Sequence, residues 1–233
     1  MGYVVWASEL IPTLTPPKTS YTIAMLPQWP HFYTGLLQAA GYLLLDSKKK
    51  KMIIISQQSD NPKDIIIDTT SYGPVFGKIR KTSSIKIREI VKNLHAKLGT
   101  IQDKHLTEQM TFQLPFLRVI TDNKELIHIS LGEKISQIQI KKLLIWIKKE
   151  SKDSNIVLLT NIELSKSPTP KKTDEYKQIL KYIKKPPTLS PVVLLFQQIL
   201  DLHKKTPEIV AYVNPGDFGK PKSLSTRYVC AVG

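Results

Sequence analysis

The chain has 233 residues, of which 41% are hydrophobic, and a single cysteine, Cys230. This length suffices for one large domain with a self-supporting core, whereas one thiol excludes an internal disulfide framework and any metal site built from several thiolates. The net charge of +15 invites a nucleic-acid partner, but only four of the 34 basic residues are arginine, the side chain that phosphate and base recognition favour, so the composition argues against nucleic-acid binding.

Apolar periodicity predicts alternating strands and helices in the first half of the chain, starting after an N-terminal segment. Residues 1–20 are expected to form a loosely packed strand and loop, followed by one domain over residues 21–233. The last helix of this half is expected to stop at Gly99. The predicted elements are strands at 21–26, 51–55 and 65–67, and helices at 31–45 and 84–98.

The same alternation continues in the second half. Pro186 and Pro187 must end one helix, and Ser190 with Pro191 is typical of the start of the next. The last two strands are expected to pair across the loop at 214–225. The predicted strands are 126–131, 156–160, 208–213 and 226–232, and the predicted helices are 134–149, 173–184 and 189–203. This order is typical of an α/β domain.

Polar side chains follow three of the predicted strands, at Gln28, at 56–61 and at Asn161. In open α/β sheets, ligands bind in the crevice outside the carboxyl ends of the strands. The segment 108–113 also carries four polar side chains just before Leu-Pro-Phe-Leu. A buried polar group without a partner costs roughly 1 to 3 kcal/mol, so we expect this segment to line the same crevice.

Five ordered motifs resemble those of one known family. Residues 26–35 resemble its Pro-His-Ala-Gly-Tyr-x-Tyr-x-Gly stretch, and residues 53–62 resemble its Ile-Leu-Gly-Pro-x-His-His-x-Pro loop. Residues 108–117 resemble Glu-His-Ser-x-Glu-x-Gln-Leu-Pro-Phe-Leu, with the last five residues intact. The other matches are 72–77, where the family has Thr-Pro-Leu-Gly, and 212–217 with 228–231, which resemble its closing Tyr-x-x-Ser-Gly-Asp and Gly-Tyr-x-Ala segments. Together, over residues 21–233, these motifs resemble the Memo family, also called AmmeMemoRadiSam system protein B.

The resemblance implies a mixed central sheet flanked by helices on both faces, as in the extradiol dioxygenases, and a metal site made of histidines and a cysteine. This chain departs from that ligand set. Gln28 stands at the first histidine, Ser59 and Asp60 stand at the His-His pair, Glu108 replaces the histidine of the fourth motif, and the cysteine position falls near Pro187. Iron, copper and zinc prefer imidazole or thiolate ligands to amides and hydroxyls. We therefore expect that the ancestral metal is lost and that no cofactor is bound.

The resulting candidate pocket contains residues from the strand ends and from the fourth motif: Gln28, His31, Ser59, Asp60, Glu108, Gln113 and Asn161. We expect a non-catalytic binding or scaffold protein, for which the resemblance implies an AMMECR-type domain or a radical SAM enzyme as partner. Three alternatives stay open. Asp60 and Glu108 could hold Mg²⁺ or Ca²⁺. They could instead act as general acid or base in a rebuilt enzyme site, with Gln28 and Gln113 orienting a small substrate. The basic surface could also bind acidic polymers.

Other features of the sequence favour ordinary roles. There is no Gly-x-Ser-x-Gly elbow and no glycine-rich phosphate loop. Cys230 lies in an apolar strand and is expected to be a buried small hydrophobe, and Trp146 fits the core face of its helix. No apolar run reaches the roughly 18 to 20 residues that a membrane span needs, and no signal-peptide pattern opens the chain, so we expect a cytoplasmic protein.

Overall fold

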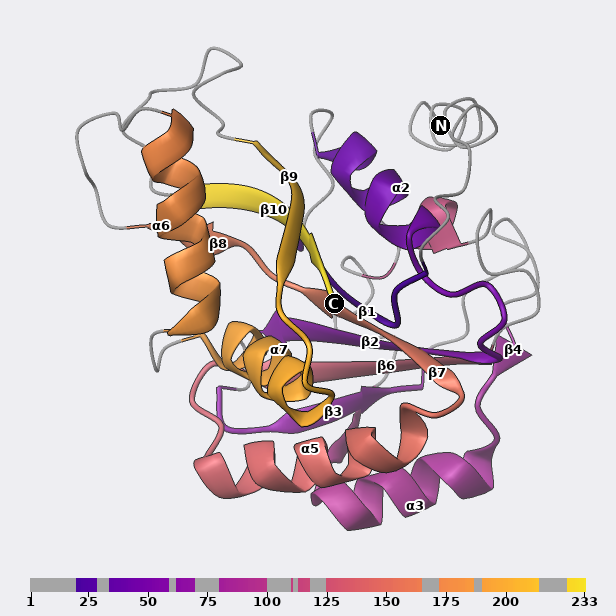
Figure 1. Cartoon of the computed structure of the whole chain (residues 1–233). Helices are drawn as coiled ribbons and strands as arrows, with labels where there is room; N and C mark the ends of the chain where they lie inside the picture. The colour runs from indigo at the N-terminus through magenta and orange to yellow at the C-terminus, as the bar shows by residue number, and fades with distance from the viewer. Residues whose placement is uncertain are drawn as a thin grey trace.

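A mixed β-sheet runs through the middle of the protein and carries helices on both faces, as Figure 1 shows. The computed structural model describes residues 20–28, 34–58, 62–69, 80–99, 110, 113–117, 125–164, 172–186, 190–213 and 226–233. The predicted α/β architecture is therefore confirmed.

The sheet has a parallel centre and antiparallel margins. Its strands are β1 (Ile23–Leu26), β2 (Lys51–Gln58), β3 (Ile65–Asp68), β4 (Arg80–Lys81), β5 (Lys97–Gly99), β6 (Glu125–Gly132), β7 (Ser154–Leu159), β8 (Ile162–Glu163), β9 (Glu208–Val213) and β10 (Thr226–Val232). Their order is β5-β3-β6-β2-β7-β1-β10-β8, with β4 beside β6 and β9 beside β10. Strands β6, β2, β7 and β1 are mutually parallel, so their carboxyl ends meet at one edge of the sheet.

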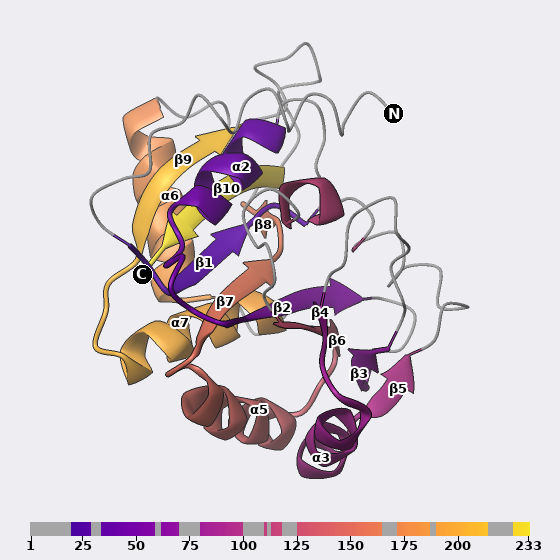
Figure 2. The same cartoon turned by 90° about the vertical axis from the view of Figure 1, so that its right-hand side faces the viewer.

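The helices lie on the two faces of this sheet, which Figure 2 shows nearly edge-on. They are α2 (Gly35–Leu43), α3 (Ser84–Leu94), α5 (Gln137–Glu150), α6 (Lys172–Lys184) and α7 (Pro191–Leu202). One face is covered by α2 together with the helical residues 113–117, and the other by α3, α5, α6 and α7. None of the helices in the described part of the chain is long and apolar enough to cross a bilayer.

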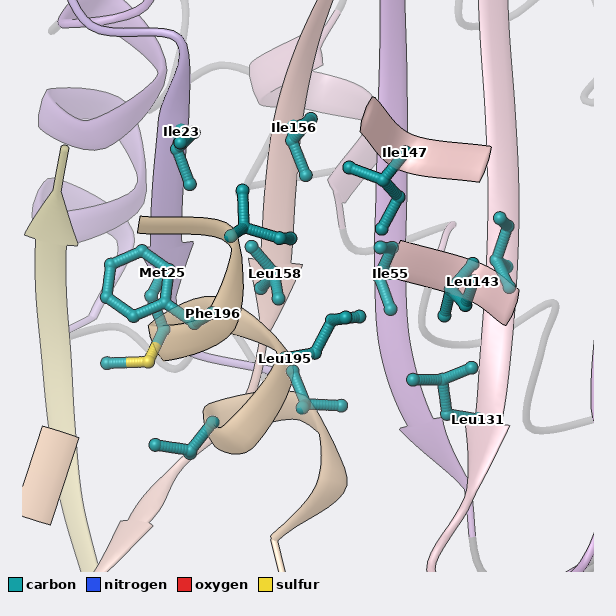
Figure 3. Close-up of a cluster of buried hydrophobic side chains, with 14 of the residues drawn as sticks. Ile23, Met25, Ile55, Leu131, Leu143, Ile147, Ile156, Leu158, Leu195 and Phe196 are labelled. Carbon is teal, nitrogen blue, oxygen red and sulfur yellow. The ribbon is translucent and has the colours of Figure 1, made fainter. Parts of the chain in front are cut away.

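Alternation along the central strands divides the interior into two cores. On β2, Ile53 and Ile55 face α5 and α7, whereas Met52 and Ile54 face α2. Figure 3 shows the first of these cores, where Leu143 of α5 and Phe196 of α7 lie over the sheet. Strands buried on both faces are nearly continuous apolar runs, which explains why the isoleucine-rich segments were readily recognised.

The helix predicted at 84–98 is wrong at its end. It stops at Leu94 because His95 takes the left-handed conformation, with φ of 51°, and the backbone N–H groups of His95 and Ala96 both donate to Val91 O. The chain then enters β5, where Leu98 pairs with β3 instead of extending the apolar helix face. Pairing with a distant strand overrides the local periodicity there.

Most other predicted elements are confirmed within a few residues. The two-residue strands β4 and β8 were missed because they are too short for any periodicity. Helix α5 starts later than predicted because Ser136 and Gln139 form a capping box. The pairing of β9 with β10 and the burial of Trp146 agree with prediction.

Candidate functional site

Three of the seven predicted pocket residues lie in the described part of the chain. Gln28 lies two residues after the end of β1, Asn161 lies two residues after the end of β7, and Gln113 is one of the described helical residues 113–117. The other four predicted residues lie outside the described residues: His31, Ser59, Asp60 and Glu108. The prediction that all seven share one pocket therefore stays a prediction, as does the position of Pro187.

Gln28 connects the ends of three strands. Its backbone N–H donates to Oδ1 of Asn161 at 3.2 Å, which joins the ends of β1 and β7. Its side-chain Nε2 donates to the backbone oxygen of Gln57 at 2.8 Å, which joins β1 to the end of β2. The carboxyl ends of three parallel strands are thus held together by amide groups.

Gln113, from the motif at 108–117, contacts the same end of β1. Its Nε2 donates to the backbone oxygen of Gln28 at 3.4 Å, and its Oε1 accepts from the hydroxyl of Tyr42 at 3.0 Å. Gln113 and Tyr42 are both fully buried. Burial raises the pKa of Tyr42 far above its usual value, so this phenol stays protonated and keeps its role as donor.

Gln38 belongs to this group but was not predicted. It lies one turn before Tyr42 on α2 and is fully buried, and its Nε2 donates to the backbone oxygen of Pro27 at 2.9 Å. Its Oε1 is buried and has no hydrogen-bond partner among the residues that the structure describes. A glutamine four residues before a tyrosine on an otherwise apolar helix was the available signal. We call Gln28, Gln38, Tyr42, Gln113 and Asn161 the amide cluster.

The described residues of the amide cluster do not fit a transition-metal site. A metal ion requires lone pairs from its ligands, whereas Nε2 of Gln28 carries N–H groups and donates to the backbone oxygen of Gln57. The described residues also contain no group of three His, Cys, Asp or Glu side chains that could hold a metal ion. The amide groups of the cluster form hydrogen bonds with the backbone and with the hydroxyl of Tyr42.

A second buried polar group lies on the same side of the sheet and was missed by the sequence analysis. His128 of β6 places its Nδ1 at 3.0 Å from Oδ2 of Asp68 and its Nε2 at 2.9 Å from Oγ of Ser56. Ser130 Oγ lies 3.5 Å from Ser56 Oγ. Ser56 and Ser130 are fully buried, His128 is 3% exposed, and the Asp68 side chain is 1% exposed. The polar residues at alternate positions 128 and 130 of an isoleucine-rich strand were the available signal.

Cys230 agrees with the prediction of a buried small hydrophobe. It is fully buried in β10, and burial raises the pKa of its thiol to about 12. A thiol with this pKa is almost entirely protonated at neutral pH and is a poor nucleophile.

Comparison with known proteins supports the fold and leaves the family open. No protein-family model matches the chain, and no curated protein does. The chain is similar to the crystal structure of the uncharacterized protein JW3007 from Escherichia coli K12, with 12% sequence identity and a TM-score of 0.50. The match covers 91% of this chain and 99% of that one. At this identity, the likeness shows a shared α/β fold and carries no activity from one protein to the other.

Proposed function

We propose that this chain is a divergent relative of the Memo family that has lost the His/His/Cys metal site and acts as a binding or scaffold protein through its amide cluster. The ordered motifs support the relationship. The position of the amide cluster, at the carboxyl ends of three parallel strands, supports ligand binding because open α/β sheets bind ligands at that edge.

The hydrogen bonds of Gln28 carry this proposal. In a metal-binding relative, the side chain at this position offers a lone pair to an ion. Here the corresponding amide donates to Gln57 O, while the Gln28 backbone is held by Asn161 and Gln113. The strand ends are joined by neutral groups that need no ion.

The chemistry of the cluster indicates what it would bind. Within the described part of the chain, Gln38 Oε1 is a buried acceptor without a hydrogen-bond partner, and leaving such a group unpaired costs roughly 1 to 3 kcal/mol. A ligand or partner segment with an N–H or O–H group would relieve this cost. An AMMECR-type domain or a radical SAM enzyme is the partner that family resemblance suggests.

Metal analysis of the purified protein tests the loss of the metal site. We expect iron, copper and zinc well below one equivalent in the natural sequence. The double variant Gln28→His with Ser59→His should gain affinity for these ions, because imidazole is a far better ligand than amide or hydroxyl. Gln197→His, on α7 across the sheet, is the matched control and should show no gain. One equivalent of tightly held iron, copper or zinc in the natural protein would overturn the proposal.

A further inference from the structure

We propose a second property that does not rest on the binding role above: Ser56, His128 and Asp68 form a nucleophile, base and orienting acid for hydrolysis of small carboxylic esters. The three residues come from β2, β6 and β3 and are distinct from the amide cluster. Their hydrogen bonds have the order and atoms of a serine–histidine–aspartate triad.

Sheet register brings the three residues together. Ile54 pairs with His128 and Ser56 with Ser130, so Ser56 and His128 are diagonal neighbours on parallel strands. Strand β3 runs antiparallel to β6 with Ile67 opposite Ile129, and the next position places Asp68 beside His128. Met52 and Ile54 face α2, and alternation puts Ser56 on that same face.

The carboxylate determines which nitrogen of His128 carries the proton. An ionised carboxylate can only accept hydrogen bonds, so Nδ1 of His128 must donate to Asp68. In the neutral imidazole, Nε2 then keeps its lone pair and accepts the hydroxyl proton of Ser56. This is the tautomer that a general base needs in order to activate a serine.

The position of Ser56 connects it to the ligand edge of the sheet. Ser56 lies near the carboxyl end of β2, next to Gln57, whose backbone oxygen accepts from Gln28 of the amide cluster. Apolar side chains of similar size at these buried positions of the sheet would carry no desolvation cost. Three strands instead contribute polar side chains here, and Ser56 Oγ also lies 3.5 Å from Oγ of Ser130.

The reaction is balanced by water alone. Ser56 Oγ bonds to the ester carbonyl carbon while its proton moves to Nε2 of His128, and the ester C–O bond then breaks as that proton passes to the leaving alcohol. Water attacks the acyl-serine by the same route, releasing the carboxylic acid and restoring the Ser56 hydroxyl. Because Ser56 is fully buried, we expect only small acyl groups, such as acetyl, to react.

Labelling of the intact protein tests the proposal. We would incubate the full chain with a fluorophosphonate that carries only short alkyl groups and, separately, with p-nitrophenyl acetate, and read the products by intact mass and absorbance. The natural protein should take up one phosphonate on Ser56 and release p-nitrophenol. Ser56→Ala should abolish the label, and His128→Gln or Asp68→Asn should slow hydrolysis at least 100-fold. Ser154→Ala on β7 removes a fully buried hydroxyl that has no hydrogen-bond partner among the described residues, and it should change neither.

A second variant tests whether reagents reach the site. Ser56→Cys preserves the size of the side chain, and its thiol should react with iodoacetamide in the folded protein, while Cys230 stays unmodified. A folded natural protein that takes no phosphonate, a label that survives Ser56→Ala, or a Ser56→Cys thiol inert until unfolding would each overturn the proposal. These variants should not change the metal content of the protein, so each of the two proposals can be overturned without overturning the other.

Discussion

At the residue scale, the clearest buried ion pair joins α6 to β10. Arg227 Nε donates to Glu175 Oε1, and each side chain is only 7% exposed. Arg227 also donates through Nη1 to the backbone oxygen of Thr226 at 2.9 Å. Removing two charges from water costs free energy, and their mutual attraction offsets this cost only while they stay paired.

Breaking this pair should destabilise the fold strongly. We expect Glu175→Gln to lower the free energy of unfolding by about 3 kcal/mol, because it leaves the Arg227 charge buried without its partner. The double variant Glu175→Leu with Arg227→Met should recover most of that loss, since no buried charge remains. Urea denaturation followed by circular dichroism measures both. Equal losses in the single and the double variant would contradict this account.

At the element scale, the close approach of α2 to the sheet depends on Gly41. A Cβ added at Gly41 would lie 2.1 Å from Cδ2 of Leu26 and 3.1 Å from Sγ of Cys230. Both neighbours are fully buried, so neither can move into solvent. The absence of a side chain at Gly41 lets the helix carry Gln38 and Tyr42 into the amide cluster.

Gly41→Ala should therefore destabilise the protein despite improving helix propensity. Overpacking typically costs roughly 1 to 3 kcal/mol, and the higher helix propensity of alanine offsets about 1 kcal/mol of this cost. We therefore expect a net loss of about 1 kcal/mol. In a Leu26→Ala background the clash disappears, and Gly41→Ala should become stabilising. Thermal unfolding of the four proteins gives this double-mutant cycle. The same sign of effect in both backgrounds would show that Leu26 is not the obstacle.

At the scale of the whole molecule, charge is heavily unbalanced, with 34 basic and 19 acidic residues. Glu150 of α5 lies between two lysines, at 3.1 Å from Nζ of Lys51 and 3.2 Å from Nζ of Lys86. Burial by itself raises the pKa of Glu150, but the hydrogen bonds and charges of both lysines outweigh it and bring the pKa below its usual value. This group ties β2, α3 and α5 at the amino end of the sheet.

The pH dependence of stability should report this contact. A carboxyl whose folded pKa is lowered stabilises the fold above its unfolded pKa of about 4.3, and the effect is lost as pH falls through the folded pKa. We expect Glu150→Gln to cost about 0.5 to 1 kcal/mol at pH 7, given its partial exposure to solvent, and nothing at pH 2 to 3. Glu133→Gln, at an exposed turn, is the control. A pH-independent difference in denaturant midpoint would argue against the charge contact.

Local sequence was a good guide to the elements and to part of the site. The isoleucine runs at β2 and β3 predicted strands because such runs indicate burial. The prolines around α7 predicted where that helix begins because proline restricts the backbone. Gln28 and Asn161 were recognised because they follow parallel strands, whose carboxyl ends meet in any α/β sheet. Leu98 was misplaced because its strand depends on pairing with Ile67 of β3, which is 31 residues earlier in the chain.

What the sequence by itself determined is the alternation of strands and helices and the polar character of the strand ends, since both follow from the periodicity of side chains along the backbone. Only the tertiary structure decided which strands are neighbours. Ser56, Asp68 and His128 are far apart in the chain, and their contact exists because β2 and β3 flank β6 in one register. Strand order is set by packing of the whole sheet, so no local pattern could have brought these three residues together.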